Sequence, residues 1–343
     1  MEILNVGLIG YGISGAFYHA PIIEYSLGLN LYSVVTSKED IVRAKYPKVK
    51  IYSSSELLFQ DPSVDIVVIA TPNHLHFDLA IEAIKNNKHV IIEKPFSITT
   101  SEAKKILEFS KKKKVIVSAY YNRRWDCDYL TIKKIINKEI VKEVKLFESY
   151  FDRYKPIVGD KWKECKLPGA GTLYDVAPHL LDQAIHLFGM PISIYAEVDY
   201  QRPETIMDDF FCIILTYPKM KAILRSSSIA FNSDLRFRVY GSNSMVIVRG
   251  RDAQGEMLQA GLNPSIKNWK PAKNMIVTLY DSKNCKEIRP EIGGYDDYYS
   301  KFRDAVITNS TFLIKADDIL NSAILLDYAV LSHKLARSVK INE

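Results

Sequence analysis

The sequence predicts an α/β protein in two parts: a doubly wound parallel sheet, followed by an α+β part with an antiparallel sheet. In the first third of the 343 residues, short apolar runs alternate with segments of helical spacing. Such alternation favours parallel strands with helices on both faces of the sheet. After about residue 120 the pattern changes, and between 192 and 289 strand-like runs follow one another across tight turns. Consecutive strands of this kind favour antiparallel pairing.

The first part repeats a strand–helix unit. Short apolar runs predict buried strands at 5–10, 31–35, 65–70, 89–92 and 115–119. Helical spacing predicts helices at 14–25, 76–85 and 101–110. Four lysines, Lys111–Lys114, follow the last of these helices and precede an apolar run. We interpret them as a solvated helix end, where they complement the helix dipole, and not as a nucleic-acid patch.

The second part begins with helices and continues with strands. Helices are predicted at 126–137 and 172–187, and two more close the chain at 296–308 and 317–337. Between them lie the strand-like runs DDFFCIILTY, KAILRSSSIA, RFRVYG and SMVIVRG. We therefore expect a first domain over 1–120 and a second, α+β domain over 121–343.

Composition argues against several classes of protein. The 46 basic and 40 acidic side chains are interleaved and leave a formal charge of only +6, so nucleic-acid binding is not expected. The longest apolar runs are strand-sized, which argues against a membrane span, and the first residues lack the pattern of a signal peptide. The four cysteines lie far apart and form no C-x-x-C pair. We expect a cytoplasmic protein without a metal site.

A glycine-rich turn follows the first strand, where Gly10, Tyr11, Gly12, Ile13, Ser14 and Gly15 form G-x-G-x-x-G. The motif lies between a predicted strand and a predicted helix, which is the context of a dinucleotide site. Gly10 would permit the tight turn, Gly12 the approach of a pyrophosphate, and Gly15 close packing of helix and strand. A glycine-rich turn without a ligand is the alternative. We predict a Rossmann domain that binds a nicotinamide dinucleotide.

The end of the second strand bears on the choice between NADP and NAD. Sites specific for NAD usually place a carboxylate there to hold the ribose hydroxyl. This chain has Thr36, Ser37 and Lys38 instead, whose hydroxyls and ammonium suit a 2′-phosphate. We therefore favour NADP, with NAD as the alternative. A surface lysine without a role in binding is the alternative interpretation of Lys38.

Two further segments carry chemistry. Lys94, within Glu93-Lys94-Pro95, follows an apolar strand and so lies at the ligand edge of a parallel sheet. A structural ion pair with Glu93 is the alternative. Asp175 and His179 are four residues apart in a predicted helix and share a face, as an acid–base pair would. Equally open is the interpretation that Asp175 caps the helix and that His179 is a buried structural histidine.

Together these residues resemble the glucose–fructose oxidoreductase and inositol dehydrogenase (Gfo/Idh/MocA) family over essentially the whole chain. The resemblance rests on the glycine motif, Thr71-Pro72-Asn73 with His74 and His76, Glu93-Lys94-Pro95, and Asp175-x-x-x-His179. Asn122-Arg123-Arg124-Trp125-Asp126 and the segment 167–175 are similar to the branch of NADP-dependent scyllo-inositol dehydrogenases. Tyr121 and Ala170 depart from that branch, so the identity of the substrate stays open.

The resemblance implies hydride transfer between a nicotinamide and a secondary alcohol of an inositol, sugar or polyol. It implies that Lys94, Asp175 and His179 are catalytic. It implies cofactor contacts from Thr71, Pro72, Asn73, His76, Glu93, Lys94 and Pro95, with Lys94-Pro95 as a cis peptide. Polar and aromatic side chains suited to a hydroxylated substrate are Asn122, Arg124, Trp125, Tyr154 and Trp162.

The family also implies a large, mostly antiparallel sheet whose open face joins copies into a homodimer or homotetramer. Candidates for that face are Phe210, Ile213, Leu215, Ile223 and Leu224, although the sequence cannot tell them from core residues. Two other functions remain open. One is a non-catalytic, NAD(P)-binding regulator of the same fold, and the other is an enzyme for a non-sugar substrate such as a dihydrodiol.

Overall fold

The computed structural model describes residues 2–231, 233–263, 265 and 269–341. The chain forms two compact units that do not follow chain order. The first unit comprises Met1–Asn122, Gln254–Trp269 and Gly294–Leu320, and the second comprises Arg123–Ala253, Lys270–Gly293 and Asn321–Glu343. The division at residue 120 into a cofactor domain and a substrate domain stays a prediction about function.

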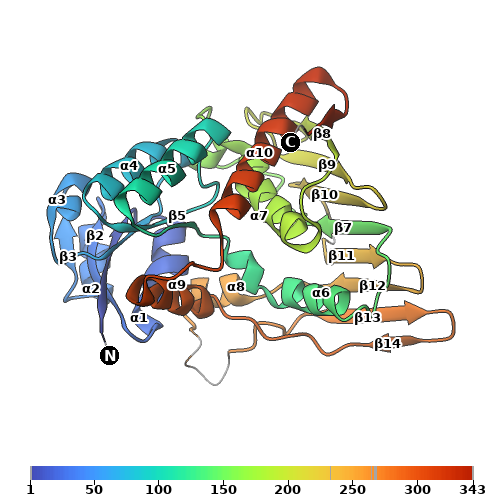
Figure 1. The fold of residues 1–343 in the computed structure, drawn as a ribbon, viewed down its shortest axis with the longest axis horizontal. Coiled ribbons are helices and arrows are strands. Elements are labelled where there is room, and N and C mark those ends of the chain that lie inside the picture. The colour runs from blue at the N-terminus through green and yellow to red at the C-terminus, as the bar shows by residue number, and fades with distance from the viewer. Residues whose placement is uncertain (1, 232, 264, 266–268, 342–343) are drawn as a thin grey trace. The chain divides into compact units, whose positions relative to one another are not determined.

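The first unit is built on six parallel strands in the order β3-β2-β1-β4-β5-β6. The strands are β1 (Leu4–Ile9), β2 (Leu29–Val35), β3 (Lys50–Tyr52), β4 (Ile66–Ile69), β5 (His89–Ile92) and β6 (Val117–Ala119). This order reverses between β1 and β4, which is where doubly wound sheets bind dinucleotides. The predicted parallel sheet is confirmed (Figure 1).

The helices of the first unit come from three stretches of chain. They are η1 (Ser14–His19, π-helical), α1 (Ala20–Tyr25), α2 (Glu39–Lys45), α3 (Ser55–Gln60), η2 (Asn73–Leu75), α4 (His76–Lys85), α5 (Thr100–Lys113), α8 (Gln254–Gln259) and α9 (Asp296–Thr308). The sequence pattern missed β3 and α3 and gave no bounds for α2; these elements are only three, six and seven residues long. The lysine run is the exposed end of α5, as predicted, and Lys114 takes a left-handed cap conformation there.

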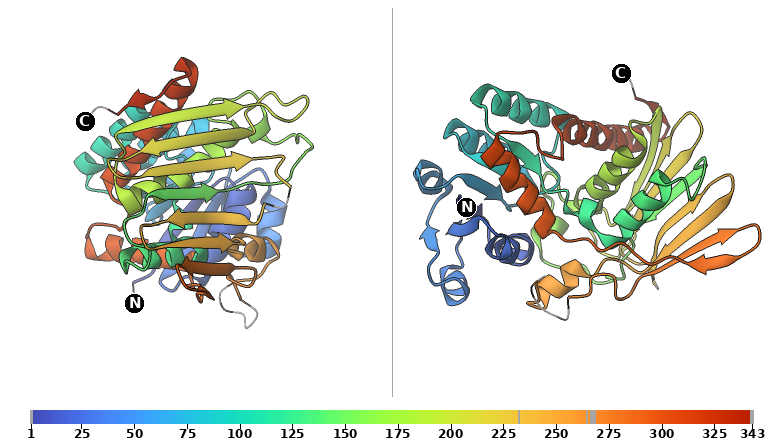
Figure 2. Two further views of the ribbon diagram at one scale, coloured as in Figure 1. Left: turned by 90° about the vertical axis from the view of Figure 1, so that its right-hand side faces the viewer. Right: turned by 60° about the horizontal axis from the view of Figure 1, so that its bottom comes forward.

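The second unit is built on a nine-stranded sheet in the order β14-β13-β12-β11-β7-β10-β9-β8-β15 (Figure 2). Its strands are β7 (Leu146–Tyr150), β8 (Ser193–Asp199), β9 (Phe210–Thr216), β10 (Lys221–Ser227), β11 (Leu235–Tyr240), β12 (Ser244–Arg249), β13 (Ile276–Asp281), β14 (Cys285–Glu287) and β15 (Val339–Lys340). Only β7 and β10 pair in parallel; every other pairing within this sheet is antiparallel. The mostly antiparallel sheet is therefore confirmed.

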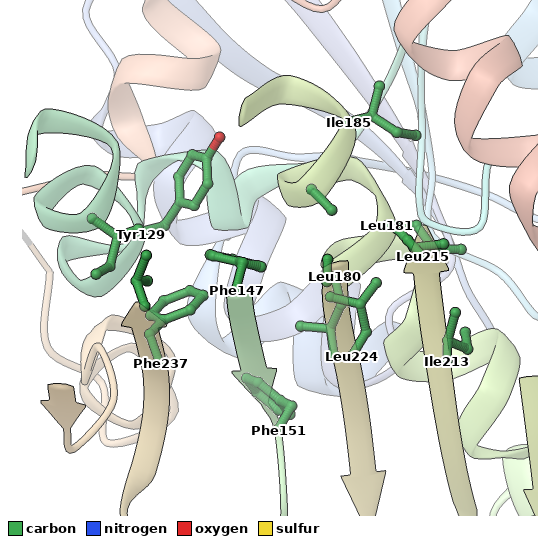
Figure 3. Packing of buried hydrophobic residues seen from close by; sticks show 14 of the residues in the cluster. Tyr129, Phe147, Phe151, Leu180, Leu181, Ile185, Ile213, Leu215, Leu224 and Phe237 are labelled. Carbon is green, nitrogen blue, oxygen red and sulfur yellow. The ribbon is translucent and has the colours of Figure 1, made fainter. Parts of the chain in front are cut away.

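Helices pack on one face of this sheet and enclose the core. The helical elements are η3 (Asn122–Trp125), α6 (Cys127–Asn137), η4 (Trp162–Glu164), α7 (Gly171–Phe188) and α10 (Ala316–Leu335). Side chains of α6, α7 and α10 form one apolar cluster with the inward residues of the strands. Figure 3 shows Leu180 and Leu181 of α7 over Leu224 and Leu215 of the sheet.

The structure separates the five apolar residues that the sequence could not assign to a face. Ile213, Leu215 and Leu224 are fully buried and belong to the core under the helices. Phe210 and Ile223 alternate with these core residues and keep partial exposure, so they lie on the opposite face. Of the two interpretations that the sequence left open, the core therefore holds for three residues, and Phe210 and Ile223 remain candidates for the open face.

No helix in the described part of the chain is long and apolar enough to cross a membrane. All four cysteines carry free thiols, and Cys127 is buried whereas Cys285 is exposed.

Candidate active site

The glycine-rich turn after β1 has one open position and two packed ones. Gly10 has a φ of +95°, and a Cβ there would lie 2.5 Å from the carbonyl oxygen of Ala70. A Cβ on Gly15 would lie 2.0 Å from the carbonyl oxygen of Gly10, so both positions require glycine. At Gly12, by contrast, no atom of the described residues lies within 4 Å of a Cβ. The backbone at Gly12 is therefore open to a ligand.

Next to this open backbone, the other residues of the motif divide into exposed and buried ones. Ile13 is half exposed, whereas Tyr11 is buried, and burial raises the pKa of the Tyr11 hydroxyl. Ser14 begins a π-helical turn that continues into α1. Insertions of this type occur often at functional sites. The hydroxyl of Ser14 donates a hydrogen bond to the carboxylate of Glu93.

Glu93 is the centre of a buried hydrogen-bonded array at the carboxyl end of β5. One carboxylate oxygen lies 3.0 Å from Nε2 of His19, and the other accepts the backbone N–H of Lys94 at 2.9 Å. The second ring nitrogen of His19 lies 2.5 Å from the hydroxyl oxygen of Tyr299 on α9. The ring of Tyr120 packs 4.3 Å from that of His19. The array thus fixes the backbone at Lys94 from three separate elements.

The array keeps the Glu93 carboxyl ionised. Burial alone would raise its pKa, but the hydrogen bond and charge of His19, the charge of Lys94 and the Ser14 hydroxyl outweigh burial and lower the pKa to about 2. Burial raises the pKa of the Tyr299 hydroxyl far above its ordinary value, so this group stays protonated.

This lowered pKa predicts a stability change at acid pH. A carboxyl with a depressed folded-state pKa stabilises the fold above its unfolded pKa of 4.5 and loses that contribution as the pH falls toward 2. We expect Glu93→Gln to lower the free energy of unfolding by roughly 3 kcal/mol at pH 7, and the difference from the wild type to shrink below pH 4.5. Urea denaturation from neutral to acid pH would measure this.

The matched control is Glu82→Gln, since Glu82 on α4 has a half-exposed side chain and, among the described residues, forms its ion pair with Lys85 on the same helix. An exposed pair of this kind contributes about 0.5 kcal/mol or less. A Glu93→Gln variant with the stability of the control at every pH would contradict the electrostatic account of the array.

A second histidine contacts the chain just after Lys94 and the loop after β4. Lys94-Pro95 is a cis peptide, as expected. His76 is fully buried, and its ring nitrogens lie 2.9 Å from the carbonyl oxygen of Pro95 and 3.1 Å from that of Thr71. Burial lowers the pKa of His76, which favours the neutral ring. His76 therefore links the loop after β4 to the segment that follows β5. Pro72 and the buried Asn73 belong to the first of these loops, between Thr71 and His76 in the sequence.

The loop after β2 carries the three residues that the sequence predicts beside the cofactor ribose. Thr36, Ser37 and Lys38 lie between β2 and α2, and the backbone N–H of Lys38 donates to Oγ1 of Thr36 at 3.0 Å. Ser37 and Lys38 are exposed. The nearest acidic residue in sequence, Glu39, is bound to Arg43 at 2.6 Å along α2. The loop thus presents hydroxyls and an ammonium.

Two features of the first unit fit a bound dinucleotide. The backbone at Gly12 has open space, and the buried Oγ1 of Thr71 has no hydrogen-bond partner among the described residues. An unpaired buried hydroxyl is costly unless a ligand or water satisfies it. Both observations fit a bound NAD(P), which Gly12, Ser14 and Thr71 would help to hold.

The catalytic candidates of the second unit lie on α7. Its start is fixed by Asp208, whose carboxylate accepts the backbone N–H of Leu173 at 2.6 Å. Gly171 has a φ of +90°, and a Cβ there would lie 1.9 Å from Oδ1 of Asp208. Burial raises the pKa of Asp208 to about 6. The neighbouring Ala170 has a φ of −81°, which an alanine adopts freely.

One turn into α7, Asp175 is bound by two cations of its own unit. Its carboxylate oxygens lie 2.5 Å from Nζ of Lys163 and 3.3 Å from Nη2 of Arg153. His179 follows one helical turn later on the same face and is 7% exposed. The helix therefore presents a carboxylate and an imidazole side by side, with Trp162 next to Lys163 in sequence.

The other predicted substrate residues lie in different surroundings. Arg124 is buried and forms a two-pronged ion pair with Asp182 of α7, at 2.8 and 2.6 Å. Trp125 and Asn122 are also buried. Tyr154 is half exposed and its ring stacks on that of Phe231 at 3.9 Å. Arg124 thus holds the helix, whereas Tyr154 is accessible to a ligand.

A metal centre has no support in the described part of the chain, where no group of three or more His, Cys, Asp or Glu residues could hold an ion. Asp182 is engaged by Arg124, and His186 lies 2.7 Å from the hydroxyl of Tyr129. Neither residue joins His179 in a ligand set.

Sequence reasoning missed the residues that support the site. His19 and Tyr299 are 280 residues apart, and Leu173 and Asp208 are 35 apart, so no local pattern joins them. Lys163 directly follows the predicted Trp162, yet nothing in the spacing indicates its contact with Asp175.

Comparison with known proteins agrees with both units. The Gfo/Idh/MocA model for an NAD-binding Rossmann fold matches residues 4–121, and the model for the C-terminal α/β domain of the same oxidoreductase family matches residues 133–341. The uncharacterized oxidoreductase YdgJ of Escherichia coli is 36% identical over 334 residues, which is 96% of each chain. The NADP-dependent scyllo-inositol 2-dehydrogenase IolW of Bacillus subtilis is 31% identical, over 99% of this chain and 97% of its own.

Solved structures show the same likeness. The structure of yvaA from Bacillus subtilis superposes with a TM-score of 0.94 at 31% identity, over 99% of both chains. A crystal structure from Klebsiella pneumoniae gives a TM-score of 0.92 at 33% identity, over 100% of this chain and 96% of its own. With both family models matched and relatives above 30% identity over nearly the full length, the chain belongs to the Gfo/Idh/MocA family of oxidoreductases, whose N-terminal part is an NAD(P)-binding Rossmann fold.

Proposed function

We propose that this oxidoreductase transfers a hydride between NADP and a secondary alcohol of an inositol, sugar or polyol. The observation that carries the proposal is Lys94, whose backbone is fixed by the buried Glu93 at the carboxyl end of a parallel strand, where such sheets bind their ligands. The likeness to a scyllo-inositol 2-dehydrogenase supports the substrate class.

Each group predicted from the sequence has a distinct role in the proposed reaction. A bound nicotinamide would supply the hydride acceptor for oxidation of the alcohol and the hydride donor for the reverse reaction. His179 takes the proton of the alcohol oxygen as the hydride leaves the same carbon, so a carbonyl forms. Lys94 donates a hydrogen bond to the reacting oxygen and stabilises its negative charge. Asp175 orients the substrate through a neighbouring hydroxyl.

The other predicted residues would bind the substrate or hold α7 in position. Tyr154 and Trp162 would contact the substrate, whereas Arg124 would act through Asp182 on the position of α7. We also propose that copies of the chain pair through the sheet face that carries Phe210 and Ile223, opposite the helices. The four free thiols suit the reducing cytoplasm.

The preference for NADP can be tested at Lys38. Lys38→Glu places a carboxylate at the end of β2, which would repel a 2′-phosphate and accept a ribose hydroxyl instead. We expect the ratio of kcat/KM for NADP to that for NAD to fall at least tenfold, because a charge-assisted hydrogen bond is lost (~1.5 kcal/mol or more). Lys104→Glu, an exposed site on α5, should leave the ratio unchanged. If both variants had the same ratio of kcat/KM for NADP to that for NAD, Lys38 would not be part of the cofactor site.

The experiment that tests the proposed function is a turnover assay with inositols and aldoses, in which reduced nicotinamide is followed by absorbance with NADP or NAD. Turnover of any member supports an alcohol dehydrogenase, and preference for NADP supports the loop after β2. Tight cofactor binding without turnover across the panel would favour a non-catalytic regulator and overturn the proposal.

A further inference from the structure

Four guanidinium groups of the second unit surround the buried ring of Phe151, just after β7. The guanidinium carbons of Arg123, Arg251, Arg153 and Arg236 lie 4.4, 4.8, 5.3 and 5.6 Å from the ring centroid. Four positive charges within about 6 Å of one point repel one another, and partial burial strengthens that repulsion. The cluster therefore needs negative charge.

Three of the four arginines form ion pairs with acidic side chains of the second unit. The pairs are Arg123 with Asp126 at 2.9 Å, Arg153 with Asp175 at 3.3 Å, and Arg236 with Asp128 at 3.4 Å. Asp175 is shared with Lys163, so this carboxylate already neutralises part of a second cation. The surroundings of Phe151 thus carry more positive than negative charge.

Arg251 is the fourth cation, and no acidic side chain of the described residues forms an ion pair with it. Its guanidinium donates to the carbonyl oxygen of Asp152 at 2.6 Å and to the hydroxyl of Ser233 at 3.2 Å. The carboxylate of Asp152 is turned to Arg225 instead. Burial, and then the charges of the other three arginines, lower the pKa of Arg251 to about 10. Its positive charge is therefore held at a cost.

We propose that this arginine cluster binds an anionic group of the substrate, which makes the substrate an acidic polyol: a sugar acid, or a phosphate ester of a sugar or inositol. The proposal rests on the proposed function, because Arg153 bridges the cluster to Asp175, the residue assigned to a substrate hydroxyl. Arginine presents a planar fork of donors that fits both carboxylate and phosphate.

A purely structural role accounts for three of the arginines but not for Arg251. Stacking on Phe151 and the ion pairs tie Arg123, Arg153 and Arg236 into the fold. The carbonyl and hydroxyl that Arg251 contacts could be served by a neutral donor at a smaller desolvation cost. Arg123 and Arg153 keep 24% and 28% of their side-chain surface exposed, so solvent and ligand reach the cluster.

The test is calorimetric binding to the full chain with reduced NADP (NADPH) present, so that the alcohols cannot be oxidised, using matched sets: glucose with glucuronate and glucose 6-phosphate, galactose with galacturonate, and myo-inositol with its monophosphate. We expect at least one anionic member to bind about 10-fold or more tightly than its neutral partner. Arg251→Gln should remove most of that difference. Arg249→Gln should preserve it, since Arg249 lies two residues away, is exposed and pairs with Asp234. Tighter binding of the carboxylates would indicate a sugar acid as the substrate, and tighter binding of the phosphates would indicate a phosphate ester.

Binding is measured without turnover, so its outcome is independent of the proposed hydride transfer. If Arg251→Gln does not fold, Arg251→Lys and the salt dependence decide: the anionic preference should fall as NaCl rises from about 0.05 to about 0.5 M. Equal affinity of every anionic member and its neutral partner would overturn the inference, as would an Arg251→Gln variant that keeps the preference. Anion preference without turnover would count against the proposed function alone.

Discussion

Replacing Lys94 with methionine is expected to lower kcat at least 100-fold while the Kd for NADP changes less than about threefold. Methionine keeps the length and much of the volume of lysine but removes the ammonium. Loss of one donor to a developing oxyanion typically costs a factor of about 10² to 10³ in kcat. Cofactor binding should survive, because Gly12 and Thr71 lie on other loops of the first unit. Steady-state kinetics and NADP fluorescence titration measure the two quantities.

The control for this substitution is Lys85→Met on α4. Lys85 is an exposed lysine of the same unit that pairs with Glu82 on its own helix, so kcat should stay at the wild-type value. If Lys94→Met turned over normally, the catalytic assignment would be wrong. If it lost NADP binding with kcat intact at saturation, Lys94 would be a cofactor ligand and not part of the chemistry.

The sequence predicted the sheet of the first unit because its central strands are mostly apolar: β4 is entirely so, and β1 and β5 each contain one polar residue. Helix 76–85 was predicted with both ends correct, since its apolar residues repeat at helical spacing and recur on one face. The strand β3 has only three residues, none of them fully buried, and so gave no pattern to detect. Strand length and burial therefore decided which elements could be read from the sequence.

The parts of the site that a pattern could not predict depend on contacts between distant segments. Helix α9 was expected as a helix, but its place in the first unit follows from Tyr298, Tyr299 and Phe302, which are buried there. Composition gives no sign that Tyr299 would reach His19. Likewise, four arginines scattered from 123 to 251 look like ordinary surface charge until the fold gathers them around Phe151. Motifs identified the candidate reacting groups, whereas the contacts that support these residues depend on tertiary packing.

The second large effect is expected at His179. His179→Gln keeps a hydrogen-bonding side chain but cannot take up a proton, so kcat for alcohol oxidation at neutral pH should fall about 10²- to 10⁴-fold. If His179 is the base, the wild-type rate should drop at low pH as the imidazole becomes protonated. The variant should lack this drop and instead gain rate as the pH rises, because hydroxide then removes the proton. A pH–rate profile of kcat/KM for both proteins measures this.

His186→Gln is the matched control, since His186 lies on the same helix two turns later and contacts Tyr129. It should retain the wild-type pH profile even if its hydrogen bond contributes to stability. A pH profile that is identical in wild type and His179→Gln would show that another group takes the proton. Asp175 would then be the candidate, because its carboxylate lies one turn away on the same face, where Lys163 and Arg153 hold it ready to accept hydrogen bonds.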